Sequence, residues 1–547
     1  MKAPFLMSVS RNDAALTPAG NASPASVITA TLLIRLSLIN VYRAVTQSVV
    51  YDEAFTYLAF LAGSPSRVFT EYTANNHVLF SLLARLTTGM FGLSELTLRL
   101  PTVVAGVVHF GTVFALCRRV FGNGLLFVVT VAALSMNPFI LDFMSAARGY
   151  GMALAFFLIA LYQLTQSLFG DDLAFDRRWL VASLALALSV SANLTFLAPA
   201  LALACVALLT GVIHDSARRR FVQPDTLRRG ALWFCAPGIV VAGALLLVPL
   251  SHARAEHFFF GANTLSRTLT SLVEASFHHD AGAWPISSPD IPSALMSRAV
   301  AWGLVVPTLL LIAGAVCLSI IRTLSAENRR RLDRTDRFCA LVGGTLVLTL
   351  LLLVGAHVWL DVPYPFARTG LYFIPLFVLA MAALVQKLRQ SAGGGRPVLA
   401  GVLLAMLSLS VGRFATEFDV TYYYEWRYDA GTRSIFNIIA RWPRAGDSGT
   451  VEVAAQRWLF SPSLNFYRVA RHNQRVAPIG DGWDPEQGNH DFFVVAPGAD
   501  PERARRVGNV VYTDPVSGVV LLSRTDGRPP LPSPPPPYEL PRDGGTD

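Results

Sequence analysis

Two adjacent carboxylates, Asp52 and Glu53, follow directly after the first long apolar run of the chain, residues 27–47. A carboxylate is costly inside a bilayer and ordinary in water, so a pair at the end of a membrane span lies at the boundary between the two. A group at that boundary can reach both a lipid-borne substrate and water, as a general base in a membrane enzyme must. We therefore take both acids as candidate catalytic residues. The alternative is that they only cap a short helix at the membrane surface.

Composition places the chain among polytopic α-helical membrane proteins. Hydrophobic residues make up 53% of it and charged residues 15%, with a mean hydropathy of +0.46, whereas soluble domains carry about 25% charged residues. We predict eleven membrane spans, of which the two within 179–213 are short enough to form a broken or re-entrant hairpin instead. The predicted spans are 27–47, 100–117, 124–144, 150–168, 179–193, 196–213, 231–250, 297–321, 338–359, 370–386 and 397–414.

Basic clusters follow the even-numbered spans. The positive-inside rule makes those loops cytoplasmic, which puts the amino terminus inside and the carboxyl terminus outside. The net charge of +9 then reflects topology and indicates no nucleic-acid partner. The first span lacks a small-residue cleavage site and is interpreted as an uncleaved anchor. The clusters include Arg118-Arg119, Arg177-Arg178, Arg218-Arg219-Arg220, Arg329-Arg330-Arg331 and Lys387 with Arg389.

The spans divide the chain into four parts. Residues 1–26 form a cytoplasmic segment, and 27–415 form the membrane domain, with outer loops at 51–99 and 251–296. Residues 416–525 read as a soluble outer α/β domain, and the proline-rich tail 526–547 is expected to be disordered. Within these parts we predict an interfacial helix at 78–86, strands at 451–455, 492–496 and 519–522, and helices at 432–441 and 462–470.

The five cysteines lie within or at the ends of apolar runs, and none lies in an outer loop. They indicate packing and neither a disulfide framework nor a metal site. Arg35 is unusual because it lies inside the first span, and a buried pairing partner is its simplest explanation. The cysteines are Cys117, Cys205, Cys235, Cys317 and Cys339.

Polar residues from separate segments are expected to meet at the outer face, because every odd-numbered span ends there. The first outer loop supplies several of them, and the third and ninth spans each deliver an arginine. Together they predict a polar cavity that opens toward the outer leaflet. The candidate residues are Asp52, Glu53, Glu71, Asn76, His77, Arg99, Arg148, Tyr150 and Arg368, with His278-His279-Asp280 expected to be a solvated loop.

Five landmarks in this order resemble those of bacterial GT-C glycosyltransferases over about residues 30–390. The most similar group is family-39-like and includes protein mannosyltransferases, the lipid A aminoarabinose transferase and rhizobial lipopolysaccharide galacturonosyltransferases. One departure is that Val78-Leu79 follow His77, where many relatives have prolines. The landmarks are Tyr51-Asp52-Glu53-Ala54-Phe55-Thr56-Tyr57, Asn75-Asn76-His77-Val78-Leu79, Leu98-Arg99-Leu100-Pro101, Ala147-Arg148-Gly149-Tyr150 and Arg368-Thr369-Gly370-Leu371-Tyr372.

The resemblance implies transfer of a sugar, with inversion, from a polyprenyl-phosphate donor to an acceptor hydroxyl on the periplasmic face of a bacterial inner membrane. The acceptor would be an envelope glycan, a lipid or a protein, and membrane lipids surround the enzyme. Asp52 would act as the general base. Arginines would stabilise the charge that grows on the leaving phosphate. The candidates are Arg148 and Arg368, with Arg99 third, while Asn76, His77 and Tyr150 would line the substrate pocket.

Several alternatives stay open. Glu53 is interpreted as a structural partner of an arginine, Arg148 as an interfacial anchor, and Arg99 as an anchor for the start of its helix. No cofactor is certain; His77 with Glu71 or Glu53 could hold a divalent metal ion, although this is a poor metal signature. A transporter or lipid flippase is the competing class, but it would need charges near mid-membrane and paired interrupted helices. A sensor or assembly protein would leave the polar cavity unused.

Overall fold

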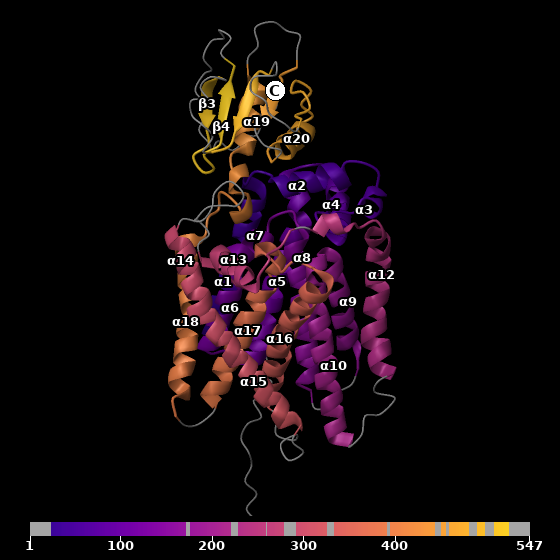
Figure 1. The fold of residues 1–547 in the computed structure, drawn as a ribbon, viewed down its shortest axis with the longest axis vertical. Helices are drawn as coiled ribbons and strands as arrows, with labels where there is room; N and C mark the ends of the chain where they lie inside the picture. The colour runs from indigo at the N-terminus through magenta and orange to yellow at the C-terminus, as the bar shows by residue number, and fades with distance from the viewer. Residues whose placement is uncertain are drawn as a thin grey trace, which may run out of the picture.

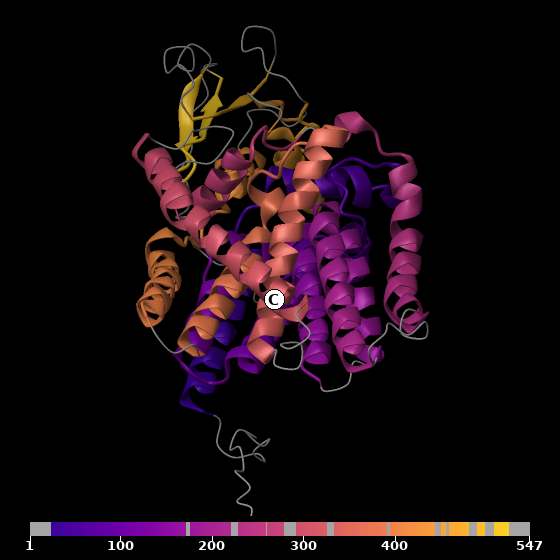
Figure 2. The same cartoon turned by 60° about the horizontal axis from the view of Figure 1, so that its bottom comes forward.

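The computed structural model describes residues 23–170, 175–219, 228–258, 260–277, 291–324, 333–390, 394–442, 450–455, 459–480, 490–497 and 508–524. Three predictions lie wholly or mostly outside these residues: the cytoplasmic segment 1–26, the loop at His278-His279-Asp280 and the proline-rich tail 526–547. The described chain forms a bundle of long helices with a small sheet at one end, and the sheet stays at that end in both views (Figures 1 and 2).

Nine helical stretches within the described residues are long and apolar enough to cross a membrane. They include all or most of α1 (Pro24–Thr46), α5 (Glu95–Phe121), α8 (Gly149–Leu168), α10 (Leu197–Arg219), α12 (Ala236–Ser251), α15 (Val306–Leu324), α16 (Arg334–Leu360), α17 (Phe373–Gln390) and α18 (Arg396–Glu417). Their outward faces are rich in exposed Leu, Ile and Val side chains, as expected of helices that face lipid.

The other two predicted spans also fall on helices, but on shorter ones. The span at 124–144 is broken into α6 (Leu125–Ser135) and α7 (Pro138–Phe143), because Asn137 caps a new helix by accepting a hydrogen bond from the Ile140 N–H. The span at 179–193 is α9 (Arg177–Ala192), whose 16 residues cover about 24 Å. A single 3₁₀ turn, Leu194–Phe196, joins α9 to α10.

The end of the bundle that carries the sheet is built from short elements (Figure 1). The predicted interfacial helix belongs to α4, which is longer than expected. These elements are α2 (Tyr51–Thr56), a π-helical turn (Tyr57–Leu61), α3 (Arg67–Thr70), α4 (Val78–Phe91), a 3₁₀ turn (Ala255–Phe258), α13 (Leu265–Phe277), α14 (Ile291–Val300) and a 3₁₀ turn (Ala367–Gly370).

The chain after α18 forms a small α/β unit with a four-stranded sheet in the order β1-β2-β4-β3. Strands β1 and β2 are parallel and the other pairs antiparallel. Both predicted helices and all three predicted strands are present, and β3 is an edge strand that we did not predict. The elements are a 3₁₀ segment (Tyr424–Asp429), α19 (Thr432–Arg441), β1 (Val453–Ala455), α20 (Ser461–Ala470), β2 (Phe492–Val495), β3 (Asn509–Thr513) and β4 (Val520–Ser523).

The predicted fold class, a polytopic α-helical protein with a small C-terminal α/β unit, is confirmed. All five cysteines are free, as expected. The prediction for Arg35 is wrong, because this side chain is exposed on the outer surface of α1 and not buried beside a partner. Position inside an apolar run does not reveal which face of the helix a residue occupies.

Candidate functional site

Asp52 lies in the first turn of α2, immediately after α1 ends, and its side chain is 5% exposed. Its Oδ2 atom is 3.3 Å from Nη2 of Arg368 and 4.0 Å from Nη2 of Arg148. The same oxygen accepts no hydrogen bond from any described residue. The carboxylate is therefore held between two cations with a lone pair still available.

Arg148 precedes α8 and reaches across to the first outer loop. Its Nη1 donates to Oγ1 of Thr56 at 2.8 Å and to the Asp52 carbonyl at 3.2 Å, and its Nη2 donates to Oδ1 of Asn75 at 2.9 Å. Its Nε atom is buried without a partner in the described chain. Several directed bonds thus fix the guanidinium while one N–H group stays free.

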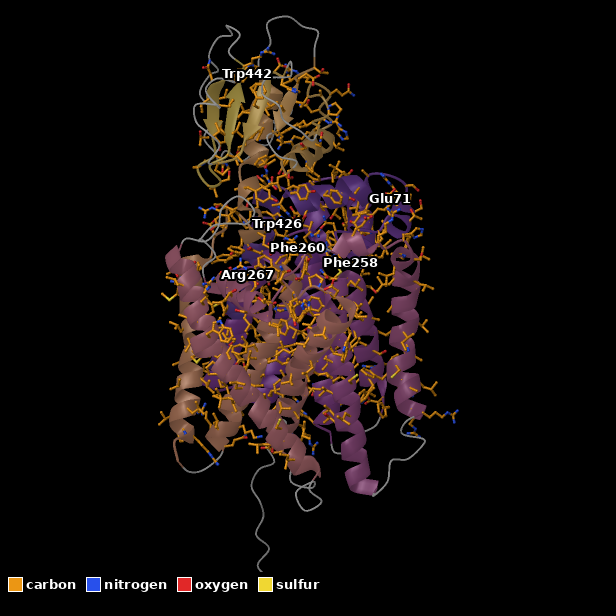
Figure 3. The ribbon with its side chains drawn as sticks, in the orientation of Figure 1. Glu71, Phe258, Phe260, Arg267, Trp426 and Trp442 are labelled. Atoms are coloured by element: carbon orange, nitrogen blue, oxygen red, sulfur yellow. The ribbon has the colours of Figure 1, made fainter. Side chains whose placement is uncertain are left out.

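Arg368 lies in the 3₁₀ turn between α16 and α17. Its Nη1 donates to Oε2 of Glu425 at 2.5 Å, and its backbone N–H donates to Oε1 of the same residue at 3.3 Å. Its guanidinium carbon is 4.4 Å from the ring centroid of Phe260 and 5.5 Å from that of Trp426. Figure 3 labels both rings at the level where the helix bundle meets the C-terminal unit. The Nε atom of Arg368 is buried without a partner among the described residues.

The charges at this site act on one another. Burial alone would lower the pKa of Arg368, but Glu425 and Asp52 raise it well above its usual value, so the guanidinium stays charged. Burial raises the pKa of Glu425, and Arg368 acts in the opposite direction. Burial, followed by the charges of Arg148 and Arg368, lowers the pKa of His77 well below its usual value. His77 is therefore neutral.

Glu53 and Arg99 form a separate buried pair. Nε and Nη2 of Arg99 donate to the two carboxylate oxygens at 2.8 and 2.6 Å. Glu53 also accepts the backbone N–H groups of Val50 and Ala147. The remaining Arg99 donors bind carbonyl groups at the end of α1, including that of Gln47 at 2.8 Å. Neither side chain has a group left for a ligand, so the pair ties α1, α2 and α5 together.

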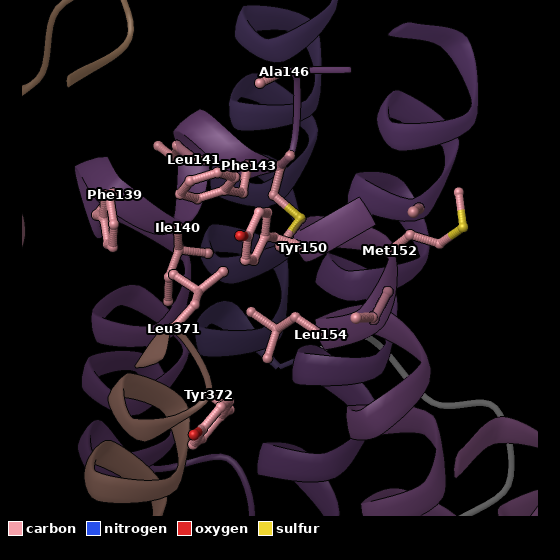
Figure 4. Close-up of a cluster of buried hydrophobic side chains, with 14 of the residues drawn as sticks. Phe139, Ile140, Leu141, Phe143, Ala146, Tyr150, Met152, Leu154, Leu371 and Tyr372 are labelled. Carbon is pink, nitrogen blue, oxygen red and sulfur yellow. The ribbon is translucent and has the colours of Figure 1, made fainter. Parts of the chain in front are cut away.

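The three predicted pocket residues differ in surroundings. Asn76 is engaged within the loop, where its amide donates to the carbonyls of Val68 and Glu71. His77 is buried, its Nε2 has no partner in the described chain, and its ring meets that of Tyr150 edge-on at 5.1 Å. Figure 4 shows Tyr150 within a cluster of buried apolar side chains.

The residues suggested for a metal do not form a metal centre. Glu71 is about half exposed and pairs with Arg67 at 2.8 Å. No group of three His, Cys, Asp or Glu suited to a metal occurs within the described ranges. The donor set thus does not fit a divalent ion at Glu71 and His77.

Sequence reasoning missed Glu425 and its neighbour Trp426. Both lie beyond the last span, in a part of the chain that we assigned to an outer domain. A signal was present: Glu425 is the one acid within the run Tyr422-Tyr423-Tyr424-Glu425-Trp426-Arg427-Tyr428. An acid flanked by aromatic residues directly after a membrane span is expected to be partly buried and paired.

The fold and the site together define a polytopic membrane protein that buries a carboxylate between two arginines at one end of its helix bundle. No family model matches the chain, and no curated protein matches it. Solved structures do resemble it. ArnT from Cupriavidus metallidurans, bound to undecaprenyl phosphate, is 16% identical, with 92% of this chain and 99% of that chain covered and a TM-score of 0.41.

Two further solved structures resemble the chain at 12% identity. The archaeal oligosaccharyltransferase AglB from Archaeoglobus fulgidus covers 92% of this chain and 75% of its own, with a TM-score of 0.39. The match to the arabinosyltransferase EmbB from Mycobacterium smegmatis covers 91% of this chain and 51% of the EmbB chain, with a TM-score of 0.31. All three proteins are GT-C glycosyltransferases, the group that the sequence landmarks resemble. Because every TM-score is below 0.5, the function has to be argued from the residues of the site.

Proposed function

We propose that the protein is a membrane glycosyltransferase that moves a sugar from a polyprenyl-phosphate donor to an acceptor hydroxyl, with Asp52 as the general base. One observation carries the proposal. Four buried polar atoms at the site lack a hydrogen-bond partner among the described residues: Oδ2 of Asp52, Nε2 of His77, Nε of Arg148 and Nε of Arg368. Buried polar atoms are nearly always satisfied, so a cluster of unsatisfied ones supports a polar ligand at that place.

The chemistry of glycosyl transfer fits these atoms. Asp52 accepts the proton of the acceptor hydroxyl while the oxygen of that hydroxyl attacks the anomeric carbon of the sugar. The bond from that carbon to the phosphate oxygen breaks, and the electron pair leaves with the phosphate. The two guanidinium groups stabilise the charge that grows there. A single displacement inverts the anomeric carbon and releases polyprenyl phosphate and the glycosylated acceptor.

A large apolar cavity lies beside the proposed phosphate site. Its volume is about 570 Å³, and α13, α15, α16, α17 and α18 contribute to its wall. Leu272 and Phe373 line it close to the turn that carries Arg368, and the Ala367 N–H donates to Oγ of Ser271 at 3.0 Å. We assign this cavity to part of the polyprenyl chain, since an apolar chain prefers an apolar wall.

The orientation is part of the proposal. The arginine clusters of the even-numbered loops support a cytoplasmic amino terminus and a site on the periplasmic face of a bacterial inner membrane. A reporter enzyme that is active only outside the cytoplasm, fused after Ser523, should be active. The site also lies at one end of the bundle, whereas a transporter or flippase would hold its charged residues near mid-membrane.

The proposal is tested with purified protein in nanodiscs and a panel of labelled polyprenyl-phosphate sugars. The protein should release polyprenyl phosphate from at least one donor when envelope lipids or glycans are added. Asp52→Asn should lower this turnover by at least about 10²-fold, because the amide cannot accept the proton. Binding of undecaprenyl phosphate should be retained, since both arginines remain.

Asp361→Asn is the matched control, because Asp361 is an exposed acid that ends α16 near the same end of the bundle. Its φ of 54° is one that asparagine adopts readily, so the variant should behave like the native protein. Full turnover in Asp52→Asn would remove Asp52 as the base. Absence of release from every donor in the native protein would overturn the transferase assignment itself.

A further inference from the structure

Glu425 reaches the site from the opposite end of the sequence. It lies in the 3₁₀ segment after α18, yet its side chain is only 8% exposed and both its oxygens face Arg368. The segment is fixed to the helix bundle directly before the contact. The Tyr424 N–H donates to Oδ2 of Asp142 at 2.8 Å, and Nη2 of Arg43 donates to the Tyr422 carbonyl at 3.1 Å. Glu425 is thus held by the membrane helices.

Arg368 is shared between two carboxylates. Its Nη1 faces Glu425 at 2.5 Å, while its Nη2 faces Asp52 at 3.3 Å. The rings of Phe260 and Trp426 lie over the guanidinium and restrict its plane. Arg368 contacts Asp52 through Nη2, while its Nε has no partner among the described residues, so the guanidinium is fixed in an orientation that does not give a two-pronged pair.

The same protein shows what an undivided arginine does. Arg99 binds Glu53 with two hydrogen bonds, and Glu53 also accepts two backbone N–H groups. Each oxygen of Glu53 thus accepts two hydrogen bonds and has no lone pair left for a further donor. Oδ2 of Asp52, in contrast, accepts no hydrogen bond from the described residues. The two neighbouring acids therefore differ in the hydrogen bonds that they accept, and the arginine that each one faces contributes to this difference.

We propose that Glu425 is a positioning residue: by binding Nη1 and the backbone N–H of Arg368, it holds the guanidinium in an orientation in which only Nη2 contacts Asp52 and no two-pronged pair forms. Asp52 thereby keeps a free oxygen for the acceptor proton, and Arg368 keeps Nε for the donor phosphate. The segment after the last span is then part of the site and not only a link to the outer unit. This role rests on the proposed glycosyl transfer.

The test begins with Glu425→Gln, which keeps the shape of the side chain and removes its charge. Arg368 should then turn to Asp52, so turnover should fall by about 10-fold or more. Binding of undecaprenyl phosphate should change by less than about 3-fold, because the pair with Asp52 takes a donor from the phosphate while the site gains a net positive charge. Glu256→Gln is the matched control: it removes the same charge from a side chain that is 69% exposed and should change neither quantity.

A double-mutant cycle with Arg368→Lys separates positioning from general support, because lysine cannot form a two-pronged pair. In that background Glu425→Gln should change turnover by less than about 3-fold. Equal losses in both backgrounds would show that Glu425 does not act through Arg368 and would overturn the inference. Glu425→Asp keeps the charge, and its turnover should lie between that of the native protein and that of Glu425→Gln. This variant provides the measurement if the glutamine variant folds poorly.

A structure of Glu425→Gln in nanodiscs gives a result that does not depend on activity. Two hydrogen bonds from Arg368 to Asp52 would support the inference, and an unmoved Arg368 would overturn it. If the native protein releases no polyprenyl phosphate, the proposed function fails. The geometry of Arg368 in the variant still decides whether Glu425 holds it.

Discussion

Neighbouring acids of one short helix are placed in opposite environments. Successive residues of an α-helix point about 100° apart. Asp52 therefore faces Arg148 and Arg368 at the site, while Glu53 turns toward the start of α5 and pairs with Arg99. The first carboxylate keeps an unbonded oxygen and the second keeps none, so their substitution should have different consequences.

Glu53→Gln should destabilise the fold more than it alters the chemistry. It leaves the buried Arg99 charge without a partner, and removal of one member of a buried pair typically costs about 3–5 kcal/mol. The thermal unfolding midpoint in detergent should fall clearly, and turnover should fall with the amount of folded protein. Asp52→Asn serves as the comparison and should lower turnover with little change in the midpoint. A stable Glu53→Gln protein without activity would instead indicate that both carboxylates serve the reaction.

The sequence was sufficient to place Asp52, Arg148 and Arg368 at one face, because span counting puts the ends of odd-numbered spans at the same level. The sequence could not distinguish an arginine whose hydrogen-bond donors are all used within the protein from one with a donor left for a ligand. Arg99 was the third candidate for the phosphate after Arg148 and Arg368, yet it is fully bonded to Glu53 and to backbone carbonyls. Hydrogen-bond partners that lie far apart in the sequence decide such roles.

At the scale of elements, two glycines let α8 approach its neighbours closely. A Cβ on Gly149 would lie 1.9 Å from the carbonyl oxygen of Ala192, and one on Gly151 would lie 1.8 Å from that of Phe143. Any side chain at either position therefore forces the backbone apart. Because Arg148 precedes Gly149, this close packing also sets where the arginine points.

Gly149→Ala should therefore be destabilising and should displace Arg148. Overpacking of a tight contact typically costs about 1–3 kcal/mol, and here the obstacle is backbone, which adapts poorly. The unfolding midpoint and the affinity for undecaprenyl phosphate should both fall. Gly111→Ala in α5 is the control, because no atom lies within 4 Å of a Cβ placed there. Native behaviour of Gly149→Ala would mean that α8 and α9 are packed more loosely than described.

Element prediction succeeded where length and hydropathy suffice and failed at local breaks. The span at 124–144 was expected to be continuous, but Asn137-Pro138 starts a new helix at its centre. The signal was present, since asparagine followed by proline favours a helix start. Strand β3 was missed because Asn509 and Val510 are exposed at a sheet edge, where no alternation of buried and exposed residues marks a strand.

At the scale of the whole molecule, the C-terminal unit is joined to the start of α2 through a buried carboxyl group. Oδ2 of Asp429 accepts the Tyr51 N–H at 2.6 Å, and Oδ1 accepts from Oγ1 of Thr432 at 2.8 Å. Burial raises the pKa of Asp429 to about 8 from its usual value of 3.8. The joint therefore has a dependence on pH that can be measured.

A raised pKa in the folded protein means that the protonated carboxyl stabilises the fold. This contribution is present in full below about pH 4 and is lost as the pH rises toward 8, because the unfolded chain ionises first. The asparagine of Asp429→Asn cannot ionise, so this variant should flatten the curve of unfolding midpoint against pH in this range. At pH 8 its unfolding midpoint should exceed that of the native protein. Asp361→Asn, an exposed substitution, should leave the curve unchanged. Parallel native and Asp429→Asn curves would show that this carboxyl does not govern the joint.

The apolar cavity beside Arg368 provides a test of how the bundle and the site work together. Leu350 on α16 lines the cavity, while the next residue, Leu351, is 62% exposed on the outer face. Leu350→Trp should fill part of the volume and weaken binding of undecaprenyl phosphate by about 10-fold, since crowding of an apolar site typically costs about 1–3 kcal/mol. A phosphate carrying a three-isoprene chain should bind as it does to the native protein, because it needs less of the cavity. Leu351→Trp, the same change one position away, should affect neither ligand. Equal weakening for both chain lengths would place the disturbance at Arg368, and unchanged binding of the long chain would show that the polyprenyl chain lies elsewhere.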